Sequence, residues 1–190
     1  MAAHPPLRSG DMVFVAAPSS LYRRMARATG GKASHVGIVF EDPKAGWVVA
    51  ESAVPVCRYR PLNKFLSRSD DDWFVVRRLK RELSPAEVAA LRRACDARMG
   101  KWYHLGFKSE SRRTSSKFVY EVYREALGID VGAVETFSEL LRRNPQESPG
   151  FWKLWSLGRI SWQRKTITPA DLLQSERLRT VWHSGNPGSA

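Results

Sequence analysis

The sequence contains few of the features that identify common functional classes. It has only two cysteines, Cys57 and Cys95, which is too few for a disulfide framework or a zinc-finger pattern. It has no glycine-rich phosphate loop and no aromatic RNA-binding motif. These absences argue against nucleotide-dependent chemistry and specific nucleic-acid recognition, and we expect both cysteines to be inert buried thiols.

Long apolar runs are also missing. No segment approaches the roughly 18–20 residues of a membrane span, so we expect no transmembrane helix. The first ten residues lack the apolar core of a secretory signal. The sequence therefore indicates either a cytoplasmic protein or export by a route without such a signal, and leaves the location open.

Positive charge is abundant. The 31 lysines and arginines exceed the 19 acidic residues and give a net charge of +12. Because the basic residues are spread along the chain, much of this charge is expected to be general surface charge. The remainder favours an anionic partner surface such as lipid headgroups or wall polymers.

The chain is 190 residues long, which suits one domain with a core of its own. We expect that domain at 1–183 and a flexible tail at 184–190, because the last seven residues are small and polar. The hydrophobic pattern predicts short strands at 12–15, 34–40, 47–54 and 73–76 and helices at 21–29, from 84 to about 99, at 116–127 and from 168. Short strands interrupted by helices predict the α+β class.

Four histidines are present, and His35 is the one with a chemical context. His4 and His183 are expected in the chain ends. If Phe40 pairs with Gly46 across a five-residue hairpin loop, His35 pairs with Glu51 on the next strand, with Cβ atoms about 4.5–5.5 Å apart. The carboxylate could then fix the imidazole tautomer, although a surface His–Glu pair would look the same in the sequence.

Two further residues bear on this hypothesis. Gly37, inside the His35 strand, suggests that another backbone or a ligand approaches closely there. Ser115 precedes the helix expected at 116–127, where a nucleophile would gain from the helix dipole. A serine in that place is by default a helix cap, and residue physics alone leaves the choice open.

Six segments occur in a characteristic order along the chain: Gly10-Asp11, Ser34-His35-Val36-Gly37-Ile38-Val39-Phe40, Ala50-Glu51-Ser52, Arg60-Pro61-Leu62, Ser115-Ser116-Lys117-Phe118-Val119 and Thr168-Pro169-Ala170-Asp171. Together they resemble the YiiX-like proteins, a circularly permuted NlpC-type branch of the papain-like thiol hydrolases that is related to the lecithin–retinol acyltransferase group. The resemblance spans roughly residues 10–182 and implies a papain-like fold with a small antiparallel sheet or barrel packed against helices.

The resemblance implies His35 as general base, Glu51 as the residue that orients it, and residue 115 as the nucleophile. It implies no metal and no cofactor. Ser115 stands where the family has cysteine, and His104 stands where it often has aspartate. Because a hydroxyl is a weak nucleophile in a site suited to a thiolate, we interpret Ser115 as an inactivating Cys→Ser substitution; a natural serine hydrolase or a dead binding module is the alternative.

For the parent enzyme, the resemblance predicts acyl transfer to water through a thioester. An amidase or peptidase acting on cell-wall peptides is the first hypothesis. A lipid-directed acylhydrolase or acyltransferase is the second, because of the related acyltransferases, the positive charge and the tryptophans Trp152, Trp155, Trp162 and Trp182. A non-catalytic binding module is the third.

Overall fold

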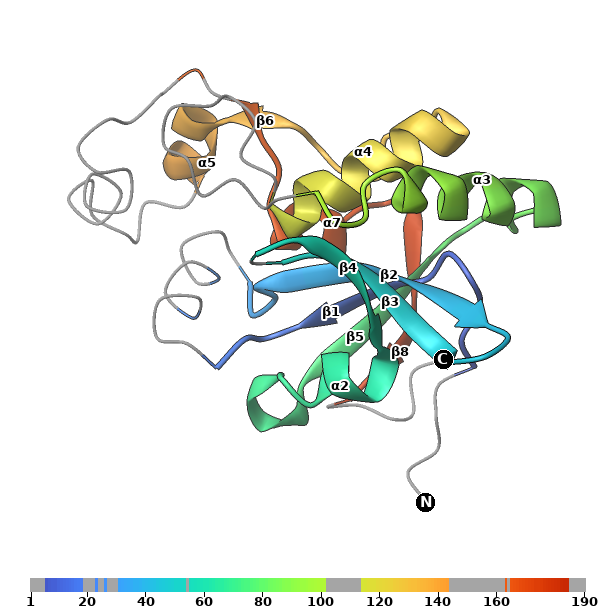
Figure 1. The fold of residues 1–190 in the computed structure, drawn as a ribbon. Coiled ribbons are helices and arrows are strands. Elements are labelled where there is room, and N and C mark those ends of the chain that lie inside the picture. The colour runs from blue at the N-terminus through green and yellow to red at the C-terminus, as the bar shows by residue number, and fades with distance from the viewer. Residues whose placement is uncertain are drawn as a thin grey trace.

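The fold is built on a six-stranded antiparallel sheet, seen edge-on in Figure 1. The computed structural model describes residues 6–18, 23, 26, 31–53, 55–101, 114–143, 163 and 165–184. The strand order is β4-β3-β2-β1-β5-β8, and a separate pair joins β6 to β7. The strands are β1 (Met12–Val15), β2 (His35–Asp42), β3 (Gly46–Ser52), β4 (Cys57–Pro61), β5 (Phe74–Leu79), β6 (Glu135–Thr136), β7 (Lys165–Thr166) and β8 (Leu178–His183).

The helices cover both faces of the large sheet. α3 (Pro85–Asp96) and α4 (Ser115–Leu127) pack together over one face, while α2 (Leu62–Leu66) lies over the other (Figure 1). Alternation along β2 divides its side chains, so that Val36 and Ile38 join the core under α3 and α4 and Val39 joins the core that includes Phe65 of α2. The remaining short elements are η1 (Asp70–Asp72), α5 (Phe137–Arg143) and α7 (Pro169–Leu173). The predicted α+β class is confirmed.

Two of the predicted helices begin at the expected signals. Ser84 and Glu87 form a capping box at the start of α3, and Thr168 and Asp171 form another at the start of α7. At α4 the prediction was wrong by one residue. Thr114 is the N-cap and accepts the Lys117 amide, so that Ser115 is the first residue inside the helix.

The hairpin between β2 and β3 is tighter than predicted. Asp42 pairs with Gly46 and Phe40 pairs with Val48, so the loop has three residues, 43–45, in place of five. The Asp42 carboxylate accepts the backbone N–H groups of Lys44 and Ala45, both at 3.0 Å, and this closes the turn. The predicted register was therefore wrong by two residues, and a shift of two keeps each side chain on its face of the sheet.

Several expectations concern residues outside the described part of the chain. Of the helix expected at 21–29, the structure describes only Arg23 and Ala26, and both are helical. His4, His104, Trp152, Trp155, Trp162 and residues 185–190 lie outside the described ranges.

The described part of the chain extends to Ser184. His183 ends β8 and its ring contacts that of Trp73 at 5.9 Å, so its expected place in a floppy end was wrong. The next residue, Ser184, hydrogen-bonds through its backbone to the Phe74 carbonyl. The division into a domain at 1–183 and a tail at 184–190 stays a prediction. In the part of the chain that is described, no helix is both long and apolar enough to cross a membrane.

Candidate active site

His35 and Glu51 meet across neighbouring strands. The Nε2 of His35, at the start of β2, lies 2.8 Å from Oε2 of Glu51, near the end of β3. The observed register makes them diagonal neighbours on one face rather than a direct pair. Glu51 is fully buried and the His35 side chain is 17% exposed, which allows a substrate to reach the ring. The predicted contact is confirmed, and the pair is not a surface pair.

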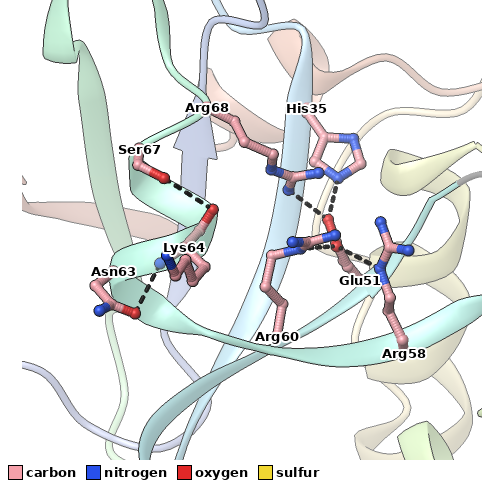
Figure 2. A network of polar contacts seen from close by, with 8 residues as sticks. All are labelled: His35, Glu51, Arg58, Arg60, Asn63, Lys64, Ser67 and Arg68. Carbon is pink, nitrogen blue, oxygen red and sulfur yellow. Dashed lines mark hydrogen bonds and ion pairs between the residues drawn. The ribbon is translucent and has the colours of Figure 1, made fainter.

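Glu51 is the centre of a cationic cluster (Figure 2). Besides His35, it accepts hydrogen bonds from Arg58 Nε at 3.1 Å, Arg60 Nε at 2.8 Å and Arg68 Nη2 at 2.6 Å. Burial by itself would raise the pKa of Glu51. The hydrogen bonds from His35, Arg60 and Arg68 outweigh burial and hold that pKa well below its usual range. The carboxylate is therefore ionised at any physiological pH.

The local sequence explains how these arginines reach Glu51. Arg58 and Arg60 are two apart on β4 and so share a face, and Arg58 pairs directly with Glu51 in the ladder. Arg68 follows α2, which crosses this face of the sheet, and its guanidinium lies 5.0 Å from the ring centre of Phe65. The centre of the Phe65 ring also lies 5.6 Å from the centre of the His35 ring, so Phe65 packs against His35.

Sequence reasoning missed this arginine cluster as part of the site. The alternation Arg58-Tyr59-Arg60, shortly after a strand with Glu51 as its second-last residue, was the available signal. Arg68 had no comparable signal, because α2 was not predicted.

Gly37 allows the two strands to approach closely. A Cβ at this position would lie 2.3 Å from Val49 Cγ1 and 2.8 Å from the Ala50 carbonyl oxygen, and neither distance is tolerable. The expected close approach of another backbone is confirmed, and it brings β3 against β2 next to the His35–Glu51 pair.

Ser115 occupies the first turn of α4, which packs on the face of the sheet opposite the one where His35 meets Phe65 and Glu51. The described hydrogen bonds bring His35 and Glu51 together, and none of them joins Ser115 to His35. Ser115 is 5% exposed. Its neighbours hold the turn in place, since Ser116 donates to the Ile167 carbonyl at 2.7 Å and Thr114 caps the helix. Because Thr114 makes the cap, the Ser115 hydroxyl is released from that task, and within the described residues it has no hydrogen-bond partner.

The contact with Glu51 selects one imidazole tautomer. An ionised carboxylate only accepts, so His35 donates from Nε2–H and keeps the lone pair on Nδ1. A neutral histidine oriented in this way can take a proton at Nδ1. Among the described residues, no three His, Cys, Asp or Glu side chains are grouped as metal ligands, and we assign no metal site there.

The chain is similar to known proteins over nearly its whole length. Protein YiiX of Escherichia coli K12, an uncharacterised protein, is 27% identical over 175 residues, which cover 92% of this chain and 85% of that protein. The crystal structure of YiiX from Escherichia coli O157:H7, described as a metalloprotein, superimposes with a TM-score of 0.80 and 26% identity and covers 93% of this chain and 97% of that one. The described fold is thus the papain-like fold that the sequence predicted.

The family model of the permuted papain-like amidases matches residues 6–182. That span contains both strands of the His35–Glu51 pair and all of α4. The chain belongs to the permuted papain-like amidase family YaeF/YiiX, C92.

Proposed function

We propose that this chain carries a cysteine-amidase site in which residue 115 is the nucleophile, His35 the general base and Glu51 the residue that orients His35. The observation that carries the proposal is the 2.8 Å contact between His35 Nε2 and a fully buried, ionised Glu51. A surface His–Glu pair would be expected to keep its carboxylate in solvent, whereas the Glu51 carboxylate is fully buried beside the ring that it orients.

The proposed reaction transfers an acyl group to water. The nucleophile at 115 gives its proton to Nδ1 of His35 and attacks the amide carbonyl, and His35 returns the proton to the departing amine. Water then attacks the acyl-enzyme, with His35 again as base, and releases the acid and free enzyme. The charge of imidazolium is stabilised in both steps by Glu51.

The first turn of α4 offers donors for the oxyanion. The first backbone N–H groups of a helix have no partner inside the helix. Thr114 Oγ1 takes the Lys117 N–H at 3.2 Å, which leaves those of Ser115 and Ser116 available to the oxyanion.

The residue at 115 decides whether the site turns over. A cysteine thiol has a pKa of about 8.5, and a helix N-terminus and an imidazolium lower it readily. The Ser115 hydroxyl ionises far less easily, so the chain as written is a silenced or very slow enzyme. A functional serine enzyme and a dead binding module are the competing interpretations.

The test is turnover by Ser115→Cys protein, with the chain as written and His35→Gln/Ser115→Cys as controls. Only the single variant Ser115→Cys should release peptide or amine from peptidoglycan fragments, because the proposed reaction needs both a thiol at 115 and the base His35. Release of fatty acid from anionic phospholipid vesicles would instead favour the lipid-directed hydrolase, which the net charge of +12 makes the second candidate. No turnover of either substrate with cysteine present would refute both enzymatic proposals and favour a binding module.

A further inference from the structure

The arginines around Glu51 supply more positive charge than that carboxylate neutralises. Three guanidinium groups, those of Arg58, Arg60 and Arg68, surround one negative charge. Within the described residues Glu51 is the only acidic partner of all three. Two positive charges are therefore left over beside His35.

The cluster also holds more donors than acceptors. A carboxylate has about four acceptor positions, and His35 and the three arginines fill them. Arg58 and Arg60 each use only Nε, so their Nη groups have no acceptor among the residues that the structure describes. The Nε of Arg68 is buried without one.

These side chains are accessible to a ligand. The side chains of Arg58, Arg60 and Arg68 are 32%, 26% and 34% exposed, although all three reach a carboxylate that is fully buried. A guanidinium presents N–H groups in a planar fork that matches the oxygens of a carboxylate or phosphate. A cluster that served only to neutralise Glu51 would need one such group, not three.

We propose that Arg58, Arg60 and Arg68 form an oxyanion-binding subsite that holds a carboxylate or phosphate group of the substrate beside His35. This inference rests on the proposed amidase function, because the subsite would hold the anionic group of a substrate near its scissile amide. The amidase would then prefer substrates with an acidic group close to the bond that it cleaves.

Arg58 is the residue with which to test the subsite. Its hydrogen bond to Glu51 is the longest of the three, and the low pKa of that carboxyl depends chiefly on His35, Arg60 and Arg68. Arg58→Gln should therefore leave the His35–Glu51 pair in place. Arg124→Gln is the matched control, since Arg124 lies in the last turn of α4 and is 66% exposed.

The experiment titrates the chain as written with acetate and with inorganic phosphate at constant ionic strength, followed by NMR of the His35 imidazole. The expected result is a saturable shift of the His35 signals. The anion concentration at half-saturation should be at least about 10-fold higher in Arg58→Gln and unchanged in Arg124→Gln. The absence of any saturable shift, or a weakening in Arg58→Gln no greater than in Arg124→Gln, would overturn the proposal. Arg60→Gln replaces Arg58→Gln if circular dichroism shows that the latter is unfolded.

This titration needs no turnover, so it fails or succeeds independently of the amidase proposal. A second experiment distinguishes a carboxylate from a phosphate group. It measures kcat/KM of Ser115→Cys protein on three matched amides, acetyl-Ala-Gly, acetyl-Ala-aminomethylphosphonate and the neutral acetyl-Ala-glycinamide. Higher kcat/KM for the carboxylate identifies a peptide-type acid, and higher kcat/KM for the phosphonate identifies a phosphate group. Equal kcat/KM for all three would refute the assignment of the subsite to substrate.

Discussion

Replacing Glu51 by glutamine tests the electrostatic centre of the site. The side chain keeps its shape and loses its charge, so three arginines are left without their acidic partner. Breaking a buried ion pair by removing one partner costs about 3–5 kcal/mol. Here the arginines are 26–34% exposed and water screens part of that cost, which places the expected loss at about 2–3 kcal/mol.

That loss is measurable by thermal and urea unfolding. For a chain of this size, about 1 kcal/mol corresponds to about 2–4 °C, so Glu51→Gln should lower Tm by roughly 4–12 °C. Asp96→Asn, which removes an acidic side chain that is 54% exposed and pairs with Arg92, is the control and should change Tm little. A Glu51→Gln protein as stable as its parent would refute the conclusion that the ionised carboxylate holds the cluster together.

Three further predictions concern stability. Gly37→Ala should cost about 1–3 kcal/mol in urea unfolding, because a Cβ would lie 2.8 Å from a carbonyl oxygen, whereas Gly31→Ala, with 3.4 Å to its nearest neighbour, should be nearly neutral; equal effects would contradict this. Ser116→Ala should cost about 1–2 kcal/mol by leaving a buried carbonyl unpaired, and Ser115→Ala, which breaks no described hydrogen bond, should cost less. The pKa of Glu87 is lowered to about 2, chiefly by its hydrogen bond to Arg81. The contribution of ionised Glu87 to folding stability is therefore present above its ordinary pKa of 4.5 and is lost as pH falls toward 2. Comparison of Glu87→Gln with the parent by thermal unfolding should show a difference at pH 6 that shrinks toward pH 2, and a constant difference would contradict the ionised contact.

The sequence predicted the parts of the site that depend on local patterns. The alternation of β2 and β3 was enough to put His35 and Glu51 on one face, and an error of two residues in the register did not matter because the pleat repeats every two residues. The capping residues Ser84 and Thr168 likewise marked helix starts through chemistry that acts over three residues.

What the sequence did not predict depends on contacts between distant segments. Arg68 reaches Glu51 because α2 crosses the sheet face on the way from β4 to β5, and Phe65 of that helix supports His35. β8 was missed because its pairing with β5 joins segments about a hundred residues apart, as in the contact of Arg77 with the Leu178 carbonyl. No local pattern encodes such pairings.

The most direct test of the central claim is the reactivity of a thiol at residue 115. Cys57 and Cys95 are buried, and burial raises the pKa of Cys95, so the chain as written should be almost inert to iodoacetamide. Ser115→Cys protein should be alkylated rapidly and at a single site near pH 6, well below the ordinary thiol pKa of about 8.5. In His35→Gln/Ser115→Cys the alkylation rate at pH 6 should be lower by about 100-fold or more. Alkylation of Cys at 115 that appears only above about pH 8 and is indifferent to His35 would contradict the account.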